Sequence, residues 1–319
     1  MLSGCAMAPE QKQYTATFLD LFDTVTTIVG KADSAEAFQA TAQEIHEELL
    51  EYHRLFDIYH DYDGLNNLKT VNDQAGIAPV EVDGRIIQLL LDCRDYYDMT
   101  GGSVNVAMGS VLKLWQEARS HGRLPGESAL AEAGRHMDME ALVIQESAST
   151  VYLSDPAVRL DVGAVAKGWA VEQVCENAPR GLLVSVGGNV CATGPKDDEG
   201  TAWVVGIQDP DGAQAYLHTL YVSQGCVVTS GDYQRFFMAD GKRYHHIIDP
   251  DTLYPAEYWR SVSILCQDSG MADALSTALF LLPREEGQAI LDQCGGEAMW
   301  VDGTGERFYS PGFAQWIRT

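Results

Sequence analysis

The stretch L-D-V-G-A-V-A-K-G-W-A-V-E-Q-V, Leu160–Val174, decides our interpretation of the fold. Apolar and polar residues alternate over 158–162, which predicts a half-buried strand that ends at Gly163. From Ala164 onward the apolar residues recur at roughly helical spacing. The sequence therefore predicts a strand, a tight turn and a helix in direct succession.

Two charged residues make this junction a candidate site. Asp161 lies near the strand end, and Lys167 falls in the first turn of the helix, where free backbone N–H groups suit anions. A lysine gains nothing from the helix dipole there, so an anionic ligand explains it best. The alternative is a solvated lysine on an exposed face. A Walker phosphate loop is a poor match, because Gly168 follows the lysine.

Composition limits the possible functions. The chain has 319 residues, with 46 acidic against 21 basic residues and a net charge of −25. Such a surface repels nucleic acid and anionic lipid, so an anionic substrate would need a few local cations or a metal ion. There is no run of about 20 apolar residues, and we expect no membrane-spanning segment. We divide the chain into an N-terminal tether, 1–15, and one domain, 16–319.

One cysteine, near the N-terminus, differs from the others in its sequence context. Seven cysteines are scattered without a C-x-x-C motif, and most are expected to be small buried hydrophobes. Cys5 differs, because Leu2-Ser3-Gly4-Cys5 resembles a bacterial lipobox, although the charged and apolar regions that should precede it are missing. Truncation and chance both explain that gap. We expect a lipid-anchored, extracytoplasmic lipoprotein if Cys5 is acylated.

The expected fold class is α+β, with short, often hairpin-linked strands and a few long helices. Regular β-α-β alternation is absent, which argues against a doubly wound parallel sheet. The predicted strands are 18–29, 158–162, 181–186, 203–208, 216–222, 226–229 and 262–266, with hairpins over 141–162 and over 236–249, the latter turning at Asp240-Gly241.

The last informative helix, 270–282, carries a candidate metal pair. Asp273 and Thr277 are four residues apart and share a face distinct from the apolar stripe. Their oxygens suit a hard cation such as Mg²⁺. The alternative is that Asp273 favours the helix dipole and Thr277 bonds back to its own helix. His246 lies in the returning strand of the predicted hairpin, where strict alternation places it with Ile248 and opposite His245 and Asp249.

Several motifs occur in the order found in one family, and the chain resembles the ApbE family of FAD:protein FMN transferases over roughly 18–282. Each motif is weak alone, and the ordered set is specific. The motifs are F-D-T at 22–24, the Tyr/Asn-rich loop at 59–72, N-V-A-M-G-S-V-L at 105–112, L-D-V-G-A-V-A-K-G at 160–168, S-V-G-G-N at 185–189, T-S-G-D-Y at 229–233, H-H-I-I-D-P at 245–250 and A-D-A-L-S-T-A-L at 272–279.

The resemblance implies a fold and a reaction. It implies a T-fold-like α+β architecture of mixed or antiparallel sheets with packed helices, in two intimate lobes with an FAD cleft between them. The reaction is Mg²⁺-dependent transfer of FMN from FAD to a Thr or Ser hydroxyl of an acceptor protein, releasing AMP. The implied metal ligands are Asp273, Thr277 and the carbonyl of Ala164, and His246 matches a histidine implicated in the transfer. The implied FAD contacts are Tyr59, Ser103, Val104, Asn105, Asp161, Lys167, Gly188, Asn189, Thr229 and Ser230.

The chain departs from the family at two positions. Leu253 stands where members commonly carry glycine after D-P-x-T, so we expect a different turn there, without positive φ. Asn105 replaces an aspartate, which puts a charge-dependent role in doubt. Two alternatives to transfer remain open: a pyrophosphatase that splits FAD into FMN and AMP, and a non-catalytic FAD-binding lipoprotein.

Overall fold

The computed structural model describes residues 11–318, so the lipobox-like Leu2–Cys5 lies outside the described residues. Its largest element is an eight-stranded sheet in the order β1-β2-β6-β7-β10-β13-β14-β15. The strands are β1 Lys12–Leu21, β2 Thr24–Ala32, β6 Leu182–Val186, β7 Asn189–Ala192, β10 Gly225–Gly231, β13 Ser261–Cys266, β14 Glu297–Val301 and β15 Arg307–Tyr309. Every neighbouring pair in this sheet is antiparallel.

Three smaller sheets accompany the large one. Their strands are β3 Val80–Glu81, β5 Thr150–Leu153 and β4 Leu142–Gln145; β8 Trp203–Gln208 and β9 Tyr216–Val222; and β11 Phe236–Ala239 and β12 Lys242–His245. The helices are α1 Ala35–Phe56, α2 Leu68–Asp73, α3 Gly84–Met99, α4 Gly109–His121, α5 Glu127–Ala133, α6 Ala166–Asn177, α7 Ser269–Leu281 and α8 Arg284–Cys294, with 3₁₀ turns at Met139–Ala141, Glu146–Ala148 and Phe313–Trp316. The predicted α+β class, with antiparallel strands, is confirmed.

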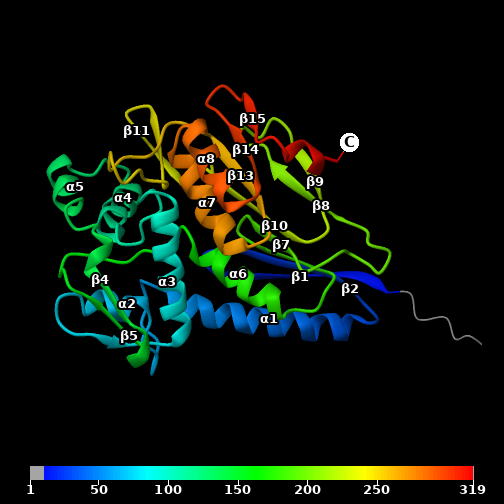
Figure 1. Cartoon of the computed structure of the whole chain (residues 1–319), viewed down its shortest axis with the longest axis horizontal. Helices are drawn as coiled ribbons and strands as arrows, with labels where there is room; N and C mark the ends of the chain where they lie inside the picture. The colour runs from blue at the N-terminus through cyan, green and yellow to red at the C-terminus, as the bar shows by residue number, and fades with distance from the viewer. Residues whose placement is uncertain (1–10, 319) are drawn as a thin grey trace, which may run out of the picture.

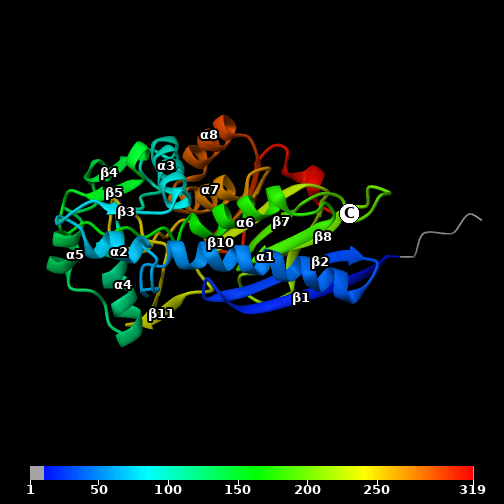
Figure 2. The ribbon, with the colours of Figure 1, turned by 90° about the horizontal axis from the view of Figure 1, so that it is seen from below.

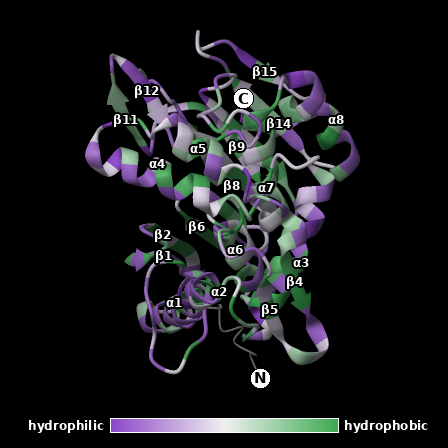
Figure 3. Cartoon of the chain, turned by 90° about the vertical axis from the view of Figure 1, so that its left-hand side faces the viewer, coloured by the Kyte–Doolittle hydropathy of each residue, from purple (hydrophilic) through white to green (hydrophobic). Residues whose placement is uncertain are grey.

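The helices cover the sheet unevenly. Figure 1 shows α2 to α5 and the β3-β5-β4 sheet gathered at one end of the molecule, while the large sheet occupies the other. Figure 2 shows α1 running along the β1–β2 hairpin. In Figure 3 most of α1 is drawn in purple, the colour of hydrophilic residues. Among the described residues, no helix combines the length and the apolar character needed to cross a membrane.

Helix α7 is deeply buried and carries both predicted side-chain ligands of the metal. It packs against α6 and against β10 and β13 of the large sheet. Leu275, Leu279 and Phe280 are fully buried. Burial of such side chains contributes about 1.5–3 kcal/mol each. A polar residue on α7 is therefore held in a rigid, largely apolar setting.

Two strand predictions are wrong. Residues 18–29 form a hairpin rather than one strand, because Phe22 and Asp23 both take left-handed backbone, with φ of 51° and 52°. Residues 158–162 are not a strand, because Arg159 makes only an isolated bridge, to Met108. The helix after them begins at Ala166, two residues later than predicted.

The later hairpin is present, but its second strand is shorter than predicted. It ends at His245, so the alternation expected through Asp249 does not hold. His246 is exposed while Ile247 and Ile248 are both buried. The hairpin at β4–β5 and helix α7 agree with the sequence to within a few residues at each end, apart from the irregular 154–162.

Candidate functional site

The Asp273 carboxylate joins three segments that are far apart in the sequence. Its Oδ2 accepts hydrogen bonds from the backbone N–H of Gly168 at 2.9 Å and from the Asn189 side-chain amide at 3.1 Å. The Lys167 ammonium lies 3.4 Å from the same oxygen. Asp273 is only 4% exposed, so these donors take the place of water.

Gly168 makes this meeting possible. A Cβ atom there would lie 2.3 Å from the Ser269 carbonyl oxygen and 2.4 Å from Asp273 Cβ. Only a residue without a side chain allows α6 and α7 to approach so closely. The glycine that the sequence offered as evidence against a Walker loop is therefore the contact point of the two helices.

Lys167 also connects Asp273 to the turn before α6. Its ammonium donates to the Gly163 carbonyl oxygen at 3.1 Å. The predicted metal ligand Ala164 is the next residue in this turn and is half-buried. Asp273 and the Gly163 carbonyl therefore both contact the Lys167 ammonium.

Thr277 lies one helical turn beyond Asp273 and is half-buried. Its hydroxyl makes no hydrogen bond to any described residue, whereas the Thr100 hydroxyl bonds back to its own helix at Tyr96. Within 11–318, Asp273 Oδ1 likewise accepts no hydrogen bond. The expectation that Thr277 bonds back to α7 is therefore not met.

Asp161 and Tyr59 meet through a residue that sequence analysis missed. The Gln116 amide, on α4, donates to the Tyr59 hydroxyl at 2.8 Å and to Asp161 Oδ2 at 3.4 Å. Loss of hydration raises the pKa of the Asp161 carboxyl. The same cause, with the negative charge of Asp161, raises the pKa of Tyr59 to about 12. Gln116 has no motif signal, because only folding brings α4 to this point.

His246 is next to a second unpredicted residue, Arg235. The imidazole Nδ1 lies 3.3 Å from the Arg235 carbonyl oxygen. Dehydration by the surrounding protein and the positive charges of Arg235 and Lys167 lower the pKa of His246 well below its usual range. Arg235 is exposed and makes no ion pair within the described chain. The only sequence signal for it is its position two residues after T-S-G-D-Y.

The glycine and hydroxyl motifs lie on neighbouring strands. Gly188, with φ of 98°, ends the β6–β7 turn, and a Cβ there would approach the Thr229 carbonyl oxygen at 3.6 Å. The Thr229 hydroxyl pairs with Ser263 at 2.8 Å, and that of Ser230 pairs with Ser276 on α7 at 2.8 Å. These residues thus border Asp273 through Asn189 and Ser276.

The Ser103–Asn105 segment lies between α3 and α4. Val104 is buried, and its N–H donates to the Thr100 hydroxyl at 3.1 Å. The Asn105 amide donates to the Met137 carbonyl at 2.9 Å, and its oxygen accepts from the Ala107 N–H at 2.8 Å. Both ends of the Asn105 amide therefore hold local backbone, and Ser103 is half-buried beside them.

The expectation for Leu253 is wrong. The leucine itself takes the left-handed conformation, with φ of 62°, and its N–H donates to the Asp249 carbonyl at 2.8 Å. The Trp115 indole donates to the Leu253 carbonyl at 2.8 Å, which fixes the turn from outside. Tertiary contacts thus hold this leucine in a left-handed backbone conformation that costs glycine less free energy.

The oxygens gathered here fit the predicted Mg²⁺. A carboxylate oxygen without a donor, a hydroxyl without a partner and backbone carbonyls of the 163–164 turn are ligands of the type that hard cations prefer. The Lys167 ammonium already lies between the turn and Asp273, which shows that the position attracts positive charge. The donor set therefore suits Mg²⁺ better than a soft metal.

The arrangement of the antiparallel sheet and its helices matches solved structures of flavin transferases. The model of the ApbE family matches residues 22–300. The protein belongs to the ApbE family, and the family predicted from the sequence is confirmed.

Relatives and solved structures agree with this assignment. A FAD:protein FMN transferase of Treponema pallidum is 38% identical over 253 residues, covering 73% of this chain and 70% of the relative. One from Klebsiella pneumoniae is 32% identical over 254 residues, covering 75% and 78%. The crystal structure of the ApbE protein from Thermotoga maritima has a TM-score of 0.87 at 28% identity, covering 97% of this chain and all of that one.

Proposed function

We propose that the protein is a Mg²⁺-dependent FAD:protein FMN transferase that attaches FMN to a Thr or Ser hydroxyl of an acceptor protein and releases AMP. The observation that supports this most is the Asp273 carboxylate. It is held by Gly168, Asn189 and Lys167, which come from two separate family motifs, while Asp273 itself belongs to a third. A diphosphate bound here would meet the few cations of a strongly acidic chain.

In this proposal Asp273, Thr277 and the Ala164 carbonyl hold Mg²⁺. When bound, the ion supplies Lewis-acid stabilisation of the diphosphate, worth several kcal/mol. Lys167 and Arg235 offset the remaining negative charge. Tyr59, Gly188, Asn189 and the other predicted contacts orient FAD.

His246 is proposed as the general base. It takes the proton of the acceptor hydroxyl, whose oxygen forms a bond to the phosphorus of the FMN half while the bond from that phosphorus to the AMP oxygen breaks. The neutral imidazole is the form needed, and a pKa below the usual range keeps it neutral at pH 7. Such a base contributes about 10²–10⁴-fold.

The test is an incubation with FAD, MgCl₂ and a candidate acceptor domain, followed by intact-mass measurement of the acceptor. We expect a mass increase equal to one FMN and stoichiometric AMP. Free FMN without labelling would instead identify a pyrophosphatase, and tight FAD binding without AMP a non-catalytic flavin carrier.

Asp273→Asn should lower the transfer rate by about 100-fold or more, since about 3 kcal/mol of stabilisation depends on that charge. Asp268→Asn is the matched control, because Asp268 caps the same helix and asparagine also caps well. Full activity of Asp273→Asn, or of the wild type in EDTA, would contradict the metal site.

We also propose that Cys5 is the acylated cysteine of an extracytoplasmic lipoprotein, which would place the enzyme at a membrane with its acceptor. The lipobox-like sequence supports this. Mass spectrometry of the N-terminal peptide from the native source tests it, and an unmodified Cys5 there would exclude the anchor.

A further inference from the structure

A group of side chains of the types that can ligate a metal lies next to the candidate flavin site, although no C-x-x-C motif marks it in the sequence. We call Glu172, Cys175, Cys191 and Cys226 the thiol cluster. Cys191 on β7 and Cys226 on β10 are direct cross-strand partners, and their sulfur atoms lie 2.7 Å apart. Glu172 and Cys175 come from α6, one and two turns beyond Gly168.

The donor atoms converge on one point. The ligand atoms of Glu172, Cys191 and Cys226 all lie within 4.8 Å of one another. Cys175 lies near this group, because the Cys191 thiol and burial raise the pKa of Cys175 well above its usual range. Cys191 and Cys226 are 5% and 2% exposed, so the sulfurs are shielded from water. A disulfide between Cys191 and Cys226 would not account for Cys175 and Glu172 beside them.

The thiol cluster lacks a positive partner. No described lysine or arginine pairs with Glu172, whose Oε2 accepts from the Ser269 N–H. Acidic groups gathered in the interior without a cation are costly unless a metal ion neutralises them.

We propose that the thiol cluster binds a thiophilic divalent cation, with zinc as the reference ion. Cys191, Cys226 and Glu172 supply three ligands and Cys175 the fourth. Zinc with Zn–S bonds of about 2.3 Å holds sulfurs about 3.7 Å apart, so the two facing thiols separate by roughly 1 Å through side-chain rotation. Binding converts each coordinating thiol to a thiolate and releases its proton to solvent.

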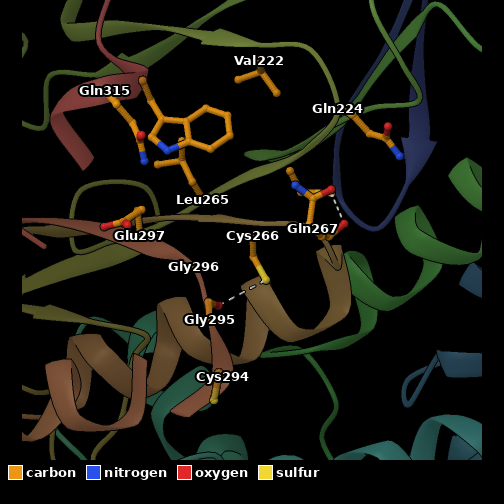
Figure 4. Close-up of a pocket in the computed structure, with 12 residues that line it drawn as sticks. Val222, Gln224, Leu265, Cys266, Gln267, Cys294, Gly295, Gly296, Glu297 and Gln315 are labelled. Carbon is orange, nitrogen blue, oxygen red and sulfur yellow. Dashed lines mark hydrogen bonds between the residues drawn. The ribbon is translucent and has the colours of Figure 1, made fainter. Parts of the chain in front are cut away.

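This site differs from the Asp273 site in chemistry and in access. Thiolates select soft metals, whereas the oxygens around Asp273 suit Mg²⁺. A pocket of about 370 Å³ is lined by Cys226 and Gln267, whose carbonyl oxygen lies 3.8 Å from the Cys226 sulfur. Figure 4 shows this pocket, whose lining contains none of the predicted flavin residues.

The location gives the ion a structural role. It would tie α6 to β7 and β10, the elements that carry Lys167, Asn189 and Thr229. A bound zinc ion should therefore raise the melting temperature and make these three elements of the flavin site more rigid.

The test uses the full-length protein, fully reduced and freed of metal by chelation, and then titrated with ZnCl₂. We expect about one zinc per chain by native mass spectrometry, a higher melting temperature, and protection of the Cys191 and Cys226 peptides from alkylation. The proposal would be overturned if the reduced wild-type protein binds no zinc. It would also be overturned if the purified protein contains a Cys191–Cys226 disulfide and still binds no metal after that disulfide is reduced.

Variants locate the ion. Cys191→Ser/Cys226→Ser should lose stoichiometric binding, whereas Cys266→Ser, in the same pocket but outside the cluster, should keep it. Because the double variant can lose stability, Glu172→Gln provides a second case, with zinc affinity reduced about 10–100-fold. Equal loss in Cys266→Ser, or unchanged affinity in both cluster variants, contradicts the assignment.

Discussion

At the scale of single residues, His246 and its charged neighbours set the proposed chemistry. Part of the His246 residue is exposed, while the protein that surrounds the ring and the positive charges of Arg235 and Lys167 lower its pKa. A cation near an imidazole disfavours its protonated form, so the base stays available in mildly acidic solution.

This predicts the pH profile. A base whose pKa is lowered from 6.5 is neutral at pH 8 and stays neutral as the pH falls to 6.5, so kcat/KM for FAD should stay flat over that range and decline only below it. A decline with its midpoint at or above pH 6.5 would refute the assignment. The Asp161 carboxyl could also titrate in this range, and Asp161→Asn distinguishes it from His246. A decline at low pH that persists in this variant does not come from Asp161.

Arg235 should act on both binding and the base. Arg235→Gln should raise the KM for FAD about 5–10-fold, equivalent to roughly 1 kcal/mol for a partly solvated charge, and move the acid limb to higher pH. Lys242→Gln removes the same charge from the tip of the same hairpin and serves as the control. If both variants behave alike, the arginine has no specific role.

At the scale of elements, the contact between α6 and α7 holds the site together. Gly168→Ala would place a methyl group against the Ser269 carbonyl and Asp273. The helices must then separate, which should lower the free energy of unfolding by about 1–3 kcal/mol and pull the Gly168 N–H from the carboxylate. Chemical denaturation and transfer assays measure both effects.

Gly84→Ala is the matched control for that substitution. Gly84 is also a helical glycine, at the start of α3, and a Cβ there meets nothing within 4 Å. Its stability should be unchanged or slightly higher, because alanine favours helix. A Gly168→Ala variant as stable and active as Gly84→Ala would mean that the close approach is unimportant.

The elements also mark the limits of sequence reasoning. Helix α7 and the hairpin at Asp240-Gly241 were predictable from apolar spacing and turn chemistry. The turn at Phe22-Asp23 was not, because Phe-Asp lacks the Asn-Gly or Asp-Gly signature of such turns. The residues of the site were named from ordered motifs, whereas Gln116 and Arg235 entered it only through tertiary packing, which no local pattern records.

At the scale of the whole molecule, charge opposes compactness. A net charge of −25 produces mutual repulsion that salt screens. Raising NaCl from about 0.02 M to about 0.3 M should therefore raise the melting temperature by roughly 2–4 °C, equivalent to about 1 kcal/mol. Choline chloride should raise the melting temperature by a similar amount, because screening depends on ionic strength and not on the identity of the cation. A lower melting temperature in salt would show that ion pairs outweigh the repulsion.

The paired hydroxyls beside α7 have a consequence for substrates. Under the proposed transfer to hydroxyl groups, the enzyme's own hydroxyls at the site are potential acceptors, yet those of Thr229 and Ser230 in β10 are paired with Ser263 and Ser276. Anchored in a sheet, they have no freedom to swing toward an incoming phosphorus atom, so self-labelling is disfavoured. Under the same proposal, we expect the acceptor to present its hydroxyl on a flexible loop or tail that can reach the site.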